Sequence, residues 1–305
     1  MTRWAGQPQP GLTTNFRLRI ELVSCKKRFH SPRMCEPGTD ALTSCAQHSG
    51  KGTRMMMNKI LIGSLLTVCM QMSLYAANCK GLPSDSDLRK QLNAAPGLTG
   101  PIGGTVGGLF NGTRMWAAVV NRDGEICAYA TSTPDPAKVW PGSQAIAKAK
   151  AYTANAFSLD QDGGPTGGFP LSTAKLYTFT QPGHSLWSLG QSNLFNPIAL
   201  APPTGQGGGL SQIAGGLIFF GGGVGLYKNG NIIGGLGISG DTSCADHEIA
   251  KRVRNLLEMD PNGGPTVDDI TYSSKDGASV FTHPLCPNTW RNGEFIGDEA
   301  KATGY

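Results

Sequence analysis

Two short motifs pair a cysteine with a histidine at the same spacing but in opposite order, Cys244-x-x-His247 and His283-x-x-Cys286. Two thiolates and two imidazoles can bind zinc tetrahedrally, so one interpretation of these residues is a metal site. The alternative is a disulfide between Cys244 and Cys286, which would bring the two histidines close together. Because disulfides persist in oxidising compartments, the choice depends on where the protein is located.

A stretch near residue 60 has the features of an export signal. Met57-Asn58-Lys59 is followed by an apolar run over residues 60–68 and by small residues at Ala76 and Ala77. A short basic start, a short apolar core and small residues are typical of a secretory signal peptide. We therefore predict a signal peptide over 57–76, a mature chain over 77–305, and a periplasmic or secreted protein. Residues 1–56 are interpreted as an upstream mis-start or disordered leader and are left out of the fold prediction.

The mature chain keeps four cysteines, and four cysteines allow three pairings. In an oxidising compartment we expect two disulfides, Cys244–Cys286 and Cys79–Cys127. A zinc site formed by Cys244, His247, His283 and Cys286 is the alternative.

The charge is distributed unevenly along the chain. Residues 1–76 carry a net charge of +7 and residues 77–305 a net charge of −2. The mature chain therefore lacks the basic stripe that nucleic-acid binding requires, and we expect no nucleic-acid partner. It also lacks an apolar run long enough for a membrane span.

Motifs of common hydrolases and of covalent haem attachment are missing from the sequence. The chain contains no Gly-x-Ser-x-Gly, His-Glu-x-x-His or Cys-x-x-Cys-His. The pattern favours binding over hydrolysis and excludes covalent c-type haem. Non-covalent haem needs only one axial ligand in an apolar pocket, so it remains compatible with the sequence.

The first half of the mature chain predicts a hairpin and a helix. Strand-like runs over 115–120 and 125–131 flank an Asp-Gly turn. An alanine-rich stretch over 143–158 predicts a helix. Its apolar face is expected to consist of Ile146, Ala149, Ala156 and Phe157. Residues 161–209 are rich in Gly, Pro, Ser and Thr and are interpreted as a docked insertion.

The second half repeats the pattern. We predict a strand over 213–220, a hairpin of 224–228 and 231–239 around Asn229-Gly230, and a helix from residue 243. The core face of this helix is expected to be Ile249, Val253, Leu256 and Leu257. A short strand over 270–272 lies in a tail, 261–305, that is otherwise loop-like. Antiparallel strands with two helices indicate an α+β layer fold.

Glycines mark the second strand of the second hairpin, at Gly234, Gly235 and Gly237. Repeated glycine in a strand indicates that something approaches the backbone closely. We expect either a flat ligand with His247 reaching the same surface, or a helix packed on the strand. The start of the second helix would also attract an anion such as a propionate.

Four segments resemble one family, the GlcG/HbpS-like haem-binding (haem-degrading domain) proteins, and in particular an exported branch. They are 116–131, 140–158, 171–187 and 221–254, and the last is the most specific, with a glycine strand, Ser-Gly and an acidic helix start. The resemblance implies a profilin-like α+β domain that forms homo-oligomers and binds haem b non-covalently. It also implies a role in iron or haem handling or in redox stress sensing.

The resemblance and the motifs together define a candidate ligand site for haem or another small planar ligand. Its residues are His247 and His283 as ligands of the haem iron, with Gly234, Gly235, Gly237 and Tyr227. Tyr177, His184 and Tyr227 are the next candidates for axial ligation. Two other functions stay open: an enzyme acting on haem or a small molecule through the glycine strand and His247, and an oligomeric structural or partner protein. The first, non-enzymatic interpretation is preferred.

Overall fold

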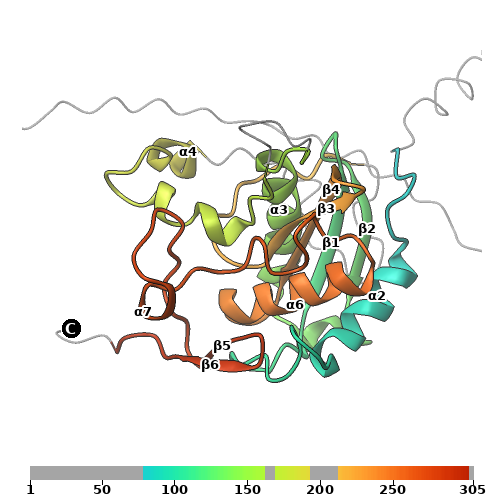
Figure 1. Ribbon diagram of the computed structural model, residues 1–305. Coiled ribbons are helices and arrows are strands. Elements are labelled where there is room, and N and C mark those ends of the chain that lie inside the picture. The colour runs from blue at the N-terminus through green and yellow to red at the C-terminus, as the bar shows by residue number, and fades with distance from the viewer. Residues whose placement is uncertain (1–77, 162–168, 193–211, 302–305) are drawn as a thin grey trace, which may run out of the picture. The chain divides into compact units, whose positions relative to one another are not determined.

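The computed structural model describes residues 78–161, 169–192 and 212–301. The predicted leader and signal peptide, and the parts of the insertion at 162–168 and 193–209, lie outside the described residues. The described chain forms a four-stranded antiparallel sheet in the order β2-β1-β4-β3, with helices on both faces (Figure 1). The predicted α+β class is confirmed. The strands are β1 (Trp116–Asn121), β2 (Ile126–Thr131), β3 (Gly223–Lys228) and β4 (Asn231–Ser239).

Both predicted hairpins are present. The β1–β2 turn contains Gly124 at φ 81°, and the β3–β4 turn contains Asn229 and Gly230 at φ 52° and 80°. In the β3–β4 turn both central residues thus have a positive φ, which is the geometry of a type I′ turn. This turn type matches the twist of the adjoining strands. The two hairpins join through the central pair β1 and β4.

Helix α3 (Gly142–Phe157) packs on the face of the sheet that Gly235 and Gly237 expose. A Cβ atom at Gly237 would lie 2.0 Å from the carbonyl oxygen of Ala147, so only glycine allows this approach. The predicted apolar face of this helix is wrong, because Ala147 and Ala151 face the sheet while Ala156 is exposed. The close approach of the strand, rather than hydrophobicity, explains why small residues lie on this face of α3.

Helices α6 (Ser243–Leu256) and α2 (Asp85–Ala94) cover the opposite face. Thr242 caps α6 by accepting a hydrogen bond from the Ala245 N–H. Ile249 and Val253 are buried in the core as predicted, and Leu256 and Leu257 pack partly buried against it. The sequence analysis did not identify α2, whose start is marked by a capping box of Ser84 and Asp87.

Two predicted strands are wrong and one hairpin was missed. Residues 213–220 form no strand and contain only isolated bridge residues, among them Ile213, which pairs with Glu125, because Gly215 and Gly216 turn the chain at positive φ. Residues 270–272 contribute only one bridge, Thr271 to Thr282. The tail instead contains the hairpin β5 (Thr289–Arg291) and β6 (Glu294–Gly297). The remaining short elements are α4 (Trp187–Ser192), α7 (Ser273–Asp276) and 3₁₀ turns at Ala95–Gly97, Pro136–Lys138, Thr173–Leu176 and Thr178–Thr180.

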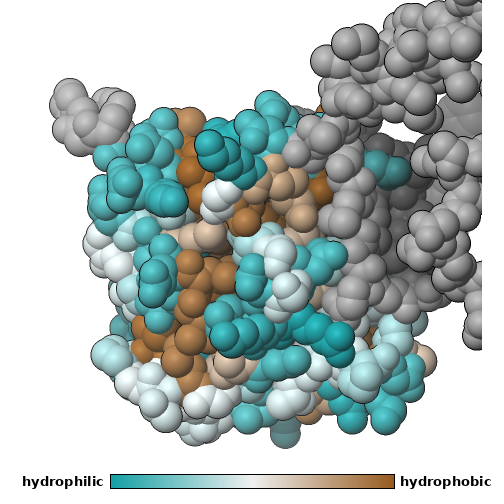
Figure 2. Space-filling model, turned by 90° about the vertical axis from the view of Figure 1, so that its right-hand side faces the viewer, coloured by the Kyte–Doolittle hydropathy of each residue, from teal (hydrophilic) through white to brown (hydrophobic). Residues whose placement is uncertain are grey.

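The outer surface mixes polar and apolar groups. On the face shown in Figure 2, apolar residues form a band with polar residues on both sides. None of the helices in the described ranges combines the length and hydrophobicity needed to cross a bilayer.

Candidate functional site

Both predicted disulfides are present, Cys244–Cys286 and Cys79–Cys127. The first joins the start of α6 to the tail, and the Cys244 N–H also donates to the Cys286 sulfur at 3.2 Å. The sulfurs and a ring nitrogen of His283 lie within 4.8 Å of one another. The four-residue zinc alternative is unsupported, because both sulfurs are consumed by the bond and His247 lies outside this group.

His283 is held in place by the backbone on both sides of its ring. Its Nδ1 lies 2.7 Å from the Pro284 carbonyl oxygen, and its Nε2 accepts from the Gly221 N–H at 3.3 Å. The ring lies 5.0 Å from that of Tyr177 and is 2% exposed. Burial lowers the pKa of His283 to about 4, so the ring is neutral near pH 7.

His247 lies on the side of α6 that faces the tail. Gly221 adjoins it, and the same glycine contacts His283, so the two histidines lie near each other as predicted. His247 Nε2 is 3.7 Å from Asp269, and neither ring nitrogen has a hydrogen-bond partner. The residue is 1% exposed, and burial lowers its pKa to about 3. The ring is therefore neutral near pH 7, and its contact with Asp269 is no ion pair there.

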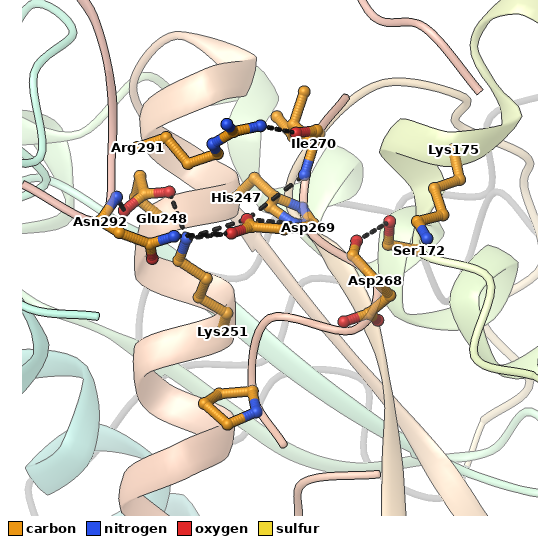
Figure 3. A network of polar contacts seen from close by, with 12 residues as sticks. Ser172, Lys175, His247, Glu248, Lys251, Asp268, Asp269, Ile270, Arg291 and Asn292 are labelled. Atoms are coloured by element: carbon orange, nitrogen blue, oxygen red, sulfur yellow. Dashed lines mark hydrogen bonds and ion pairs between the residues drawn. The ribbon is translucent and has the colours of Figure 1, made fainter. Parts of the chain in front are cut away.

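Around His247 lies a buried network that ties the tail to α6. Figure 3 shows Lys251 between Glu248 and Asp269. Asn292, in the β5–β6 turn, donates its backbone N–H to Glu248 at 3.0 Å and its side-chain amide to Asp269 at 3.0 Å. Burial raises the pKa of Glu248. For Asp269 burial acts in the same direction, but the charge of Lys251 and the hydrogen bonds from Lys251 and Asn292 outweigh it, and the pKa is lowered. The network thus connects the β5–β6 turn to α6.

The glycine strand is covered rather than open. Gly235 and Gly237 face α3, while Gly234 faces the other side of the sheet, where a Cβ atom would lie 3.2 Å from Leu82. His247 belongs to α6, on the face of the sheet opposite to α3. The expectation that His247 and the glycines line one open surface is therefore wrong, and the helix-packing alternative describes Gly235 and Gly237.

The other predicted ligand residues are spread over the fold. Tyr227 is buried in β3 and donates its hydroxyl to the Leu159 carbonyl at 2.9 Å, and burial raises its pKa to about 12. Tyr177 is half-buried beside His283, whereas His184 is exposed. Of these residues, Tyr177 thus lies beside one of the two predicted histidine ligands, His283.

The start of α6 offers little to an anion. The Ala245 N–H donates to Thr242 and the Cys244 N–H to Cys286. The predicted propionate site at this helix start thus finds two of its donors already occupied.

A buried ion pair was missed by the sequence analysis. Lys150 of α3 lies 2.7 Å from Asp246 of α6 and also donates to the Ile238 carbonyl at 3.0 Å. Both side chains are buried, and burial lowers the pKa of Lys150 and raises that of Asp246 to about 6. A lysine in a small-residue helix packed on a sheet needs polar or aromatic partners when it is buried, and this requirement is the signal that could have indicated the pair.

An open pocket lies between the segments that precede β1 and α3. It has a volume of about 350 Å³ and is lined by Phe110, Arg114, Ala137, Lys138, Val139, Trp140 and Pro141. Phe110 and Trp140 meet edge to face with their centroids 5.6 Å apart. Arg114 stacks on the Phe110 ring at 4.6 Å. In contrast to the α6–tail contacts, these groups face solvent.

Comparisons with known proteins found a similarity for the central part of the chain. Residues 109–254 match the family described as "Haem degrading protein HbpS-like". A search of curated proteins found no match. Similar solved structures include the Klebsiella pneumoniae protein ORFY, at 22% identity over 48% of this chain and 76% of that chain, with a TM-score of 0.34.

Two further structures are similar at the same level. A complex of PduOC with haem is 22% identical over 56% of this chain and 91% of that chain, with a TM-score of 0.36. A double mutant of HbpS from Streptomyces reticuli is 18% identical over 57% of this chain and 86% of that chain, with a TM-score of 0.32. The family match is the finding that bears on function.

Proposed function

Residues 109–254 belong to the HbpS-like family of haem-degrading proteins, and on this premise we propose that the protein binds haem non-covalently. The observation that carries the proposal is the extent of the match, which spans both hairpins of the sheet together with α3 and most of α6. The absence of Cys-x-x-Cys-His from the sequence agrees with non-covalent binding.

The residues first expected to hold haem do not fit it in the conformation described. His247 and His283 are buried, and α3 covers Gly235 and Gly237. A ring of that size finds no opening there, and the disulfide holds the tail against α6. We therefore assign no chemical step to haem at this position.

A titration of the mature protein with hemin tests the proposal. We expect a saturable change of the Soret band at one haem per chain or per fixed number of chains. His247→Ala and His283→Ala test axial ligation. Because both rings are buried, we expect an unchanged Soret position and a loss of stability. A Soret shift in either variant would restore that histidine as the ligand. No saturable change in the parent would overturn haem binding.

A second candidate function is haem breakdown, favoured by the family description. Incubation of the haem-loaded protein with a chemical reductant and oxygen distinguishes the two functions. Loss of the Soret band at the rate of free haem supports binding alone, whereas protein-dependent turnover supports an enzyme. A protein that neither binds nor degrades haem would favour the third function, that of an oligomeric structural or partner protein.

We also propose export and self-association. Mass spectrometry of the secreted or periplasmic product should find an N-terminus near Ala77, and a product that retains residues 1–54 would contradict export. Native mass measurement with and without hemin tests the homo-oligomer. Haem binding by an exported protein would support a physiological role in iron or haem handling or in redox stress sensing.

A further inference from the structure

The pocket lined by Phe110, Arg114, Lys138 and Trp140 offers aromatic and cationic side chains to a ligand. The α6–tail region does not, because its polar side chains are buried. We propose that it binds a planar conjugated carboxylate and, resting on the proposed haem binding, that a tetrapyrrole docks there by the edge that carries its carboxylates. The pocket lies within the segment that matches the family, residues 109–254.

Aromatic walls supply the planar part of the site. Trp140 is 48% exposed, although large aromatic side chains usually bury most of their surface. Phe110 supports it from the side, with an angle of 72° between the two rings, and Val139 is buried beside them. The exposed surface of the indole is thus held in a fixed orientation and is available for stacking.

Two cations supply the charged part. Arg114 is stacked on Phe110, which holds its guanidinium at the pocket, and Lys138 lines the same pocket. Neither has an ion-pair partner in the described part of the chain, and no acidic side chain lines the pocket. Carboxylates form the strongest hydrogen bonds available to such cations. Aromatic walls with a few convergent polar groups are the usual composition of a small-molecule site.

The adjoining helix adds to the positive potential. Pro141 lines the pocket and precedes α3, whose start has no side-chain cap and no acidic residue in its first turn. The partial positive charge of a helix start favours a nearby anion. This contribution supplements the two cations.

The size of the pocket limits how much of the ligand it can enclose. A volume of about 350 Å³ is near the lower end of the usual range of about 300–1,000 Å³ for small-molecule sites. It accommodates a two-ring aromatic acid, or one edge of a tetrapyrrole with the rest of the macrocycle outside. The site supplies no ligand to iron. Binding of a metal-free porphyrin therefore distinguishes this site from one that depends on axial ligation of the iron.

The test compares hemin with metal-free protoporphyrin IX on the full mature protein. Trp140→Ala removes the stacking surface, and Arg114→Gln with Lys138→Gln removes both charges. We expect each variant to bind both ligands about tenfold more weakly. The matched control, Arg89→Gln with Lys90→Gln on α2, removes two charges elsewhere and should bind like the parent. Thermal unfolding and far-ultraviolet circular dichroism verify that all variants are folded.

Each other outcome overturns a defined part of the proposal. If the parent binds hemin and the pocket variants bind it equally well, the pocket is wrong and haem binding stands. Binding of hemin without binding of the metal-free porphyrin also overturns the pocket and leaves haem binding in place, because iron ligation then carries the affinity. A control that weakens as much as the pocket variants shows non-specific charge attraction and likewise overturns the pocket. A parent that binds neither ligand overturns both proposals.

Discussion

The α6–tail contacts and the pocket before α3 contain similar groups under opposite conditions. In the first, His247, His283 and the charged side chains around Lys251 are buried, and most of their polar atoms have partners within the chain. In the second, the rings and cations are partly exposed, and Arg114 and Lys138 have no ion-pair partner among the described residues.

This difference assigns a role in stability to the α6–tail contacts and a role in binding to the pocket. Buried charges whose partners lie in the same chain stabilise one arrangement of the elements and leave nothing for a ligand. Exposed aromatic and cationic groups contribute little to folding and keep their interactions available. Substitutions in the α6–tail region and in the buried pair should therefore change stability, whereas substitutions in the pocket should change binding.

The largest expected effect is at the buried pair between α3 and α6. Lys150→Met leaves the Asp246 carboxylate buried without its cation, which should lower the free energy of unfolding by about 3–5 kcal/mol. The double variant Lys150→Met with Asp246→Leu should recover most of the loss. Chemical denaturation measures both, with the exposed Lys138→Met as a control. A single variant as stable as the parent would contradict a structural role for the pair.

Removal of the tail disulfide is expected to have the next largest effect. Cys244→Ser with Cys286→Ser should lower stability by about 2–4 kcal/mol, because the unfolded chain is no longer restrained. Hydrogen exchange should rise in β5 and β6, which the tail places against α6. Unchanged exchange there would show that the polar network of Asn292 holds the tail without the disulfide.

A methyl group on the glycine strand should cost up to about 3 kcal/mol. Gly237→Ala places a carbon against the Ala147 carbonyl oxygen, so α3 must move away from the sheet. Gly97→Ala is the matched control, since nothing lies within 4 Å of the added carbon. If the two variants unfold alike, α3 does not pack as described.

The buried histidines should make stability depend on pH. The pKa of His283 is about 4 and that of His247 about 3 in the folded chain, against an ordinary 6.5, so below pH 6.5 the unfolded chain binds protons that the folded chain does not. The stability that the two neutral histidines contribute is therefore fully present above pH 6.5 and is lost as the pH falls toward 4. Each histidine contributes a slope of up to about 1.4 kcal/mol per pH unit.

The difference in slope between parent and variant isolates this contribution. Asp246, with its pKa raised to about 6, contributes a slope of opposite sign in every variant and cancels in the comparison. Unfolding measured between pH 6 and 4.5 should show a smaller slope in His247→Ala and in His283→Ala. His184→Ala, an exposed control, should keep the parent's slope. Equal slopes in all four proteins would mean that the buried rings are accessible to protons.

The smallest expected effect on stability is at the pocket. Trp140→Ala, and Arg114→Gln with Lys138→Gln, should change the free energy of unfolding by less than about 0.5 kcal/mol, since these side chains are exposed. Chemical denaturation of the ligand-free variants measures this change. A loss above about 1 kcal/mol would place the pocket with the structural contacts and weaken the contrast between the two regions.

Elements with strong local signals could be predicted from the sequence. The Asp-Gly and Asn-Gly turns indicated both hairpins, and Thr242, a residue type that favours the N-cap position, precedes the predicted start of α6 at residue 243. The β5–β6 hairpin has the same Asn-Gly signal at Asn292-Gly293, but its strands of three and four residues are too short to show a periodicity. The false strand at 213–220 had apolar residues without the backbone geometry to pair.

The chain's residues by themselves determined which groups were available: four cysteines in residues 77–305, two histidines near two of them, and a strand rich in glycine. Only the tertiary structure decided that α3 covers that strand and that the histidines face the tail. Lys150 and Asp246 are 96 residues apart, and the pocket joins residue 110 to residues 137–141. Local patterns act over a few residues, whereas burial and exposure follow from the packing of distant segments, so the accessible site could not be predicted from spacing alone.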